Sequence, residues 1–112
     1  MSARTETLVW LAQRASAAVL ALCVAVHLAT IIVAVRGGLN AADILGRTRG
    51  SVAWAAFYGV FVLAVAIHAP IGLRTIAQEW LQWRGRAADA TWAIVALALL
   101  ALGARAIVAV TL

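Results

Sequence analysis

The sequence is poor in charged residues, in cysteine and in proline. Charged residues make up 12% of the 112 residues and hydrophobic residues 66%, whereas globular domains carry about 25% and about 45–50%. A soluble chain of this size would lack the polar surface to cover so much apolar material. The single cysteine, Cys23, excludes an internal disulfide, a CxxC metal motif and a c-type haem attachment motif. The composition therefore predicts an integral membrane protein.

The sequence also has no lysine, so its net charge of +5 comes from arginine. No segment is both soluble and basic enough to form a nucleic-acid-binding patch, and we therefore expect no nucleic-acid partner. Arginines at the ends of membrane-spanning helices explain the positive charge instead.

Long apolar runs cover residues 15–35, 52–73 and 90–112. Each is long enough for a helix across a bilayer core of about 30 Å. The second helix is expected to continue past the membrane surface, toward Trp80 and Trp83, which suit the interfacial aromatic belt. We predict an all-α fold with one transmembrane domain, residues 1–112, and spans at about 15–35, 52–78 and 90–112.

The arginines divide almost evenly between the two sides of this topology. The N-terminal side, together with the loop between the second and third spans, holds five, and the opposite side holds four. Because cytoplasmic loops carry an excess of basic residues, this small bias favours a cytoplasmic N-terminus.

Both histidines lie inside predicted spans, His27 in the first and His68 in the second. Ionisable residues inside a membrane are costly and are functional by default. The simpler alternative is a neutral imidazole that is hydrogen-bonded to a neighbouring helix. Gly72 follows His68 by one helical turn, and Arg74 lies near the surface. A small residue lets a flat macrocycle approach, imidazole binds iron and arginine pairs with a propionate, so the pattern favours bis-histidine haem.

Two residues near His68 each allow a second interpretation. Gly72 also permits close packing of helices, which is the rival explanation for a glycine here. Pro70 leaves the carbonyl of Ala66 without its helical donor and is expected to bend the helix. The bend either steers His68 toward a cofactor or is incidental.

The two histidines differ in their expected depth in the membrane. At 1.5 Å per residue, His68 lies about 9 Å from Arg74 and His27 about 20 Å from Arg14, if both arginines mark one surface. The two ligands of one haem should lie at a similar depth, so a difference of roughly 10 Å predicts two haems at two levels. Each haem would take one ligand from this chain and one from another chain.

Two segments resemble the membrane-anchor cytochrome b subunits of the succinate dehydrogenase/fumarate reductase family. QRASAAVL, residues 13–20, is similar to the family's opening segment, usually His-Arg-x-Ser-Gly. HAPIGLRTIAQE, residues 68–79, is similar to its H-x3-G-x-R-x4-[D/E] pattern on the second helix. The length, the spans and a cytoplasmic N-terminus also agree with this family.

The resemblance implies that the chain binds b-type haem. His68 matches the haem-ligand histidine, and Arg74 matches an arginine near the haem propionates. His27 matches the first-helix histidine of the two-haem members, and its spacing of 41 residues from His68 is similar to theirs. We therefore expect two haems, with His27 and His68 as ligands of haem iron and Gly72 beside the macrocycle.

The resemblance also implies a quinone site near the iron–sulfur subunit, lined by Arg14 and Ser16. Gln13 and Ala17 replace the usual histidine and glycine of the opening segment. Trp10 stands where a quinone-contacting serine is often found, and we include it in the expected site. Because two-haem members often use menaquinone, menaquinone is favoured over ubiquinone.

The function implied by the resemblance is that of a membrane anchor of succinate:quinone oxidoreductase in a bacterial cytoplasmic membrane. The sequence has no Gly-rich nucleotide fingerprint and no cysteine cluster, so the flavin and the iron–sulfur clusters would lie in two soluble partner subunits. This chain would conduct electrons without catalysing the oxidation itself, and a second anchor subunit would supply the other half of a haem-binding bundle.

Two other functions were weighed against this one. A small multidrug-type transporter needs four spans and a membrane-embedded carboxylate, whereas the four acidic residues lie outside the spans or at their edges. A haem-free structural anchor that only docks a partner stays open. Arg105, near the end of the third span, is expected to extend its side chain to the outer surface, and the alternative is contact with a propionate of the deeper haem.

Overall fold

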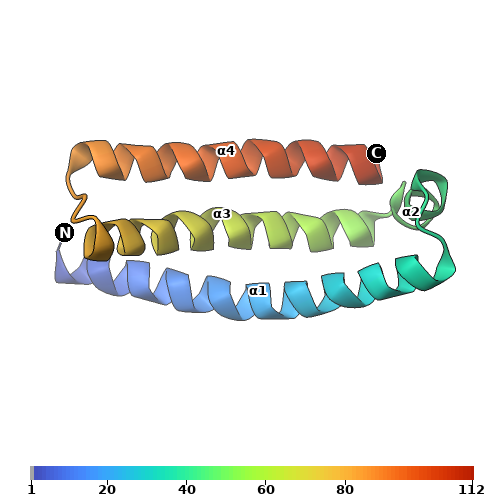
Figure 1. Cartoon of the computed structure of the whole chain (residues 1–112), viewed down its shortest axis with the longest axis horizontal. Coiled ribbons are helices and arrows are strands. Elements are labelled where there is room, and N and C mark those ends of the chain that lie inside the picture. Colours follow the sequence, from blue (N-terminus) through green and yellow to red (C-terminus); the bar gives the residue numbers. More distant parts are fainter. Residues whose placement is uncertain (1) are drawn as a thin grey trace.

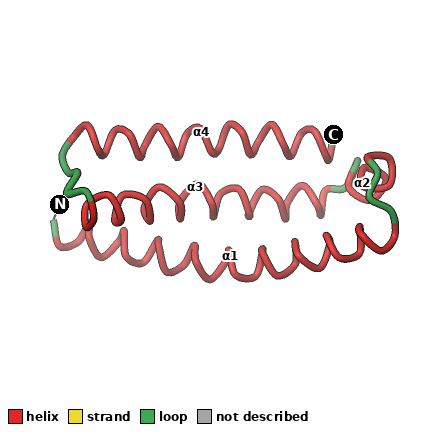
Figure 2. Tube along the Cα trace, in the orientation of Figure 1, coloured by secondary structure: helices red, strands yellow, loops and turns green. Residues whose placement is uncertain are grey.

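The computed structural model describes residues 2–112, which form long helices joined by short connections (Figure 1). The long helices are α1 (Ala3–Gly37), α3 (Val52–Trp80) and α4 (Arg86–Thr111), and a short helix, α2 (Ala41–Thr48), lies between α1 and α3. No strand occurs within residues 2–112 (Figure 2). The three long helices are long and apolar enough to cross a membrane. The all-α, membrane-spanning prediction is confirmed.

The helices extend beyond the predicted spans into polar sequence. α1 begins at Ala3 because Ser2 caps it: the Ser2 hydroxyl oxygen accepts a hydrogen bond from the backbone N–H of Thr5 at 3.2 Å. α4 begins at Arg86, ahead of the apolar run at residue 90. Once a helix has formed, each further turn adds hydrogen bonds at little cost, so apolar length underestimates helix length.

The apolar pattern predicts no helix in the connection that contains α2. Asn40 caps α2, since its side-chain oxygen accepts a hydrogen bond from the Asp43 N–H at 2.8 Å. The other end of α2 is fixed to α4, where the Thr48 hydroxyl donates to the Val110 carbonyl at 2.6 Å. The Gly50 N–H also donates to the Thr111 carbonyl at 2.7 Å. These bonds satisfy carbonyls that the end of α4 leaves without helical partners.

α3 lies between α1 and α4 and packs against both (Figure 1). Its buried residues are small or compact: Ala64, Ala66, Pro70 and Ala77. α3 continues through Pro70 for ten residues, to Trp80. Small residues at helix contacts are typical of membrane proteins, because they let backbones approach closely.

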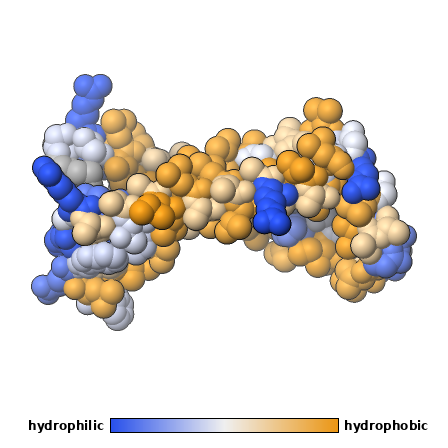
Figure 3. Space-filling view, turned by 90° about the horizontal axis from the view of Figure 1, so that it is seen from above, coloured by the Kyte–Doolittle hydropathy of each residue, from blue (hydrophilic) through white to orange (hydrophobic). Residues whose placement is uncertain are grey.

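Most of the apolar surface of the helices faces outward. Within the most apolar window of each long helix, 11% of the residues are buried in α1 and α3 and none in α4. Hydrophobic residues cover most of the middle of the face seen in Figure 3, and hydrophilic residues gather toward the ends. This distribution suits helices whose outer faces meet lipid or other membrane helices.

Gly103 provides a test of the packing between α3 and α4. A Cβ added at Gly103 would overlap the Val62 side chain, whereas a Cβ at Gly59 of α3 would meet no atom within 4 Å among the described residues. We predict that Gly103→Ala destabilises the protein by about 1–3 kcal/mol through overpacking. Gly59→Ala, the matched control, should leave it unchanged or more stable. Denaturation in SDS–detergent mixtures, followed by circular dichroism, measures both, and equal midpoints for the two variants would contradict the packing.

Candidate functional site

An open groove of about 690 Å³ lies between α1 and α3, at the end of the molecule that carries the N-terminus. This volume lies within the range typical of small-molecule sites. The groove brings together five of the residues predicted from the sequence: Trp10, Arg14, His68, Gly72 and Arg74. Residues that the sequence had not assigned to a site also line it, among them Glu6, Gln13 and Gln78.

Ser16, the sixth predicted residue on this side, lies against His68 and is 5% exposed. The Ser16 hydroxyl oxygen lies 3.4 Å from His68 Nδ1 and 3.1 Å from the Gln13 carbonyl oxygen, to which it donates. A serine hydroxyl has one proton to donate. When that proton is directed to the Gln13 carbonyl, the contact with His68 needs an Nδ1–H donor. The neutral imidazole in this arrangement carries its proton on Nδ1 and has its lone pair on Nε2.

Arg14 and Trp10 stand one turn apart on α1, on the wall of the groove. The Arg14 guanidinium carbon lies 5.6 Å from the centre of the Trp10 ring, which is within the range of a cation–π contact. Trp10 is 58% exposed, so it presents its aromatic surface to whatever adjoins the groove. The pair offers a cation and an aromatic face at one end of the groove.

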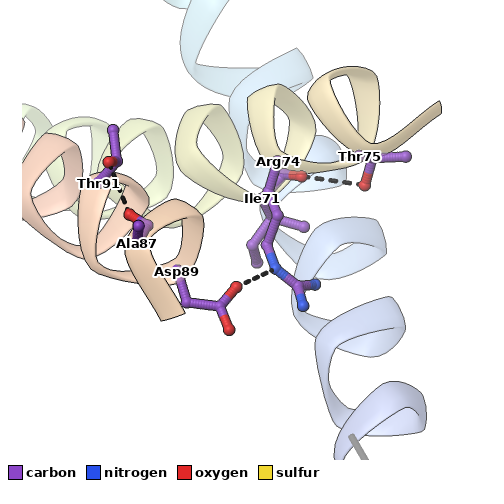
Figure 4. A network of polar contacts seen from close by, with 6 residues as sticks. All are labelled: Ile71, Arg74, Thr75, Ala87, Asp89 and Thr91. Atoms are coloured by element: carbon purple, nitrogen blue, oxygen red, sulfur yellow. Dashed lines mark hydrogen bonds and ion pairs between the residues drawn. The ribbon is translucent and has the colours of Figure 1, made fainter. Parts of the chain in front are cut away.

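Arg74 lines the groove from α3 and forms an ion pair with the start of α4 (Figure 4). Its Nε donates to Asp89 Oδ1 at 3.1 Å, with 20% of the Arg74 side chain and 57% of the Asp89 side chain exposed. An ion pair this close to solvent contributes about 0–1 kcal/mol to stability. Its main effect is to hold the arginine at the mouth of the groove. Asp89 was not marked as a site residue by the sequence, although it flanks the same loop as Arg74.

Gly72 faces α1 across the groove. A Cβ added there would lie 3.3 Å from Gln13 Nε2, closer than most contacts of real side chains. The Gln13 Oε1 atom is buried and has no hydrogen-bond partner among the described residues. Within this chain, therefore, the missing side chain of Gly72 makes room for Gln13, as the helix-packing explanation expects.

His27 lies away from this groove, among aromatic residues of α3. The centre of its ring lies 6.0 Å from that of Tyr58 and 5.6 Å from that of Phe61, both edge-on. His27 Nδ1 is buried and has no hydrogen-bond partner among the described residues. Hollows of about 200, 390 and 310 Å³ adjoin its ring. The aromatic residues along 54–61 are a sequence signal that could have marked this second pocket.

The structure does not bring the two histidines together. Arg14 and Arg74 line the same groove, but they stand at different levels along it, about 3 Å and about 9 Å from the level of His68 by helical rise. His68 lies at the level of Ser16, and from residue 16 to residue 27 the helical rise is about 16 Å. The separation in depth is thus at least as large as the sequence estimate of roughly 10 Å.

The chain was compared with known protein families, curated proteins and solved structures. The family model described as succinate dehydrogenase/fumarate reductase transmembrane subunit matches residues 1–105, which include the groove and both histidines. No curated protein and no solved structure matches the chain. The match spans most of the chain and agrees with its all-helical, membrane-spanning fold. The chain therefore belongs to the family of transmembrane subunits of succinate dehydrogenase and fumarate reductase.

Proposed function

We propose that this chain is a haem-binding anchor that passes electrons between an iron–sulfur subunit and quinone. The observation that carries the proposal is the arrangement of His68, whose ring is oriented by Ser16 in a groove shared with Arg14 and Arg74. Membership of the family supplies the setting, a membrane subunit of a succinate- or fumarate-converting complex.

The residues present fit a b-type haem at each histidine. Among the described residues, no three His, Cys, Asp or Glu side chains gather as a metal-binding group. Iron held by a macrocycle needs only an axial imidazole from each chain, so isolated histidines suffice. His27 meets this need as an imidazole that lines apolar hollows, and His68 with an Nε2 lone pair.

Each group of this chain has a separate task in the proposed site. Bound haem supplies reversible one-electron transfer at its iron. Ser16 holds His68 in one tautomer, since a ligand histidine is fixed through a hydrogen bond at its other nitrogen. Arg74 places positive charge where a haem propionate would leave the membrane core. The apolar faces of the helices would keep water away from the haem macrocycle.

The quinone site is proposed for the same end of the molecule, on the outer part of the groove. Arg14 would donate to a quinone carbonyl oxygen, and Trp10 would pack on the ring. A quinone accepts protons with electrons, so a site near the membrane surface, where Glu6 also lines the groove, gives access to solvent protons. We favour menaquinone, on the resemblance to two-haem members alone.

The proposal requires partner subunits that cover the hollows beside the two histidines and the end of the molecule that bears the groove. Each histidine lies beside a hollow that the three helices do not fill, and a neighbouring chain would supply the other ligand of a haem held there. We propose a second anchor subunit for these faces, and flavoprotein and iron–sulfur subunits at the end that bears the groove. With the N-terminus in the cytoplasm of a bacterium, these soluble subunits lie on the cytoplasmic side.

The first test is the reduced-minus-oxidised spectrum of the purified complex. The proposal predicts a b-type α-band, and it predicts that His68→Ala and His27→Ala each remove about half of its amplitude, because one axial ligand of one haem is lost. Cys23→Ala is the matched control, since Cys23 is buried one turn from His27 and is given no role. A complex without a b-type band would instead be a haem-free structural anchor.

The tautomer assignment for His68 predicts a distinct effect of Ser16. Ser16→Ala removes the acceptor for Nδ1–H, and we expect the affinity for one haem to fall about tenfold, as for other partners of metal ligands. Ser16→Thr keeps a hydroxyl and should preserve affinity. The rate at which haem passes to an excess of a haem-scavenging protein measures this. Equal rates for the Ala and Thr variants would contradict the assignment.

The quinone assignment predicts that Arg14 affects one half of the reaction. Arg14→Gln should lower succinate:quinone reductase activity about tenfold, the effect of losing one hydrogen bond to a charged donor. Succinate oxidation with a soluble dye as electron acceptor should not change. Arg4→Gln is the control, because Arg4 lies on the same helix and outside the groove lining. A parallel loss of both activities would place Arg14 in subunit docking and not at the quinone.

A further inference from the structure

The hollow beside His27 extends along α1 to the short helix α2. Its α1 wall is the stripe His27, Thr30, Ile31 and Ala34, which repeats at helical spacing on one face. The rise from residue 27 to residue 34 is about 10 Å. At the far end of this stripe the hollow is lined by Arg47 of α2.

Arg47 is held in place by the bonds that fix α2. The next residue, Thr48, is 7% exposed and donates to the Val110 carbonyl at 2.6 Å. The Arg47 guanidinium lies at the end of α1, since a Cβ on Gly37 would be 3.5 Å from Arg47 Nη2. The C-terminus of a helix carries partial negative charge and favours a cation there. Among the described residues, no carboxylate forms an ion pair with Arg47.

The sequence alone offered a different cation for this level of the membrane, Arg105 of α4. Arg105 does not line any of the hollows that adjoin His27. Arg47 does, and it stands beyond the apolar stripe, on the side toward the membrane surface opposite the N-terminus. Of these two arginines, a ligand that reaches from His27 toward that surface would therefore meet Arg47.

We propose that α2 caps the haem site at His27 and that Arg47 pairs with a propionate of that haem. This inference rests on the proposed function, because it needs a haem at His27. An arginine suits a carboxylate through two parallel N–H donors. Trp54 and Tyr58, which are stacked with ring centres 5.7 Å apart, form the opposite wall and keep the macrocycle edge out of water.

A redox titration of the whole complex tests the inference, with the b-band as the signal. The positive charge of Arg47 disfavours ferric iron, so its removal should lower the potential of one haem only. For Arg47→Gln we expect the reduced-to-oxidised ratio of that haem, at a fixed potential, to fall about threefold, the value of a partly exposed ion pair. Arg47→Lys keeps the charge and should restore most of the ratio. Arg105→Gln, which removes the same charge from α4, should have no effect.

The outcomes separate this inference from the proposed function. The inference is supported if Arg47→Gln lowers the redox potential of one haem, or loses that haem selectively, and Arg105→Gln does neither. The inference is overturned if Arg105→Gln changes the potential of one haem and Arg47→Gln does not, or if neither variant changes a potential. The two-haem function stands in both cases. If both haems are lost in Arg47→Gln, haem retention by Arg47→Lys decides, and loss there too overturns the inference. A wild-type complex with a single transition overturns the two-haem proposal, and the inference with it.

Discussion

The structure depends on one constraint: three helices are too few to enclose the polar side chains that they carry. Each polar atom inside a bilayer must find a partner within the protein, because lipid offers none. α3 is covered on two sides, because it packs against α1 and α4. The outer faces of all three helices stay open. His27 Nδ1 and Gln13 Oε1 are buried without a partner among the described residues. Because the outer faces stay open, we propose that other molecules complete the bundle.

This constraint explains where the polar groups of the chain are found. Two polar side chains that the chain satisfies alone, Ser2 of α1 and Asn40 of α2, cap the ends of helices. The Arg74–Asp89 pair joins two helices at a membrane surface, where both side chains still reach water. His27 and His68, in contrast, lie inside the apolar runs. Because their positions differ in depth, we propose a separate haem at each histidine.

Much of the fold was predictable because membrane spans are long and uniformly apolar. The three long helices and their order follow from the runs at 15–35, 52–73 and 90–112. Their true ends were not predictable, because Ser2 and the polar first turn of α4 extend helices beyond the apolar runs. α2 was missed because a helix of eight residues is far shorter than the apolar runs that mark spans, and its far end is held by a bond to α4.

The candidate site was predictable in its residues but not in its contacts. Local spacing placed His68, Gly72 and Arg74 near one surface, and the structure brings them into one groove with Arg14 and Trp10. Spacing within a helix could not show that Ser16 of α1 meets His68 of α3, or that Arg47 reaches the hollow at His27. Both contacts join segments distant in sequence, and only the packing of helices determines them.

The central claim is that the two histidines serve two haems at different depths. A cryo-electron microscopy map of the intact complex tests this most directly. The account predicts density for two macrocycles, one at His68 and one at His27, each with its second axial ligand from a neighbouring chain. The ligand positions on α1 and α3 would differ in depth by roughly 10 Å or more. A single macrocycle held between His27 and His68 would contradict it.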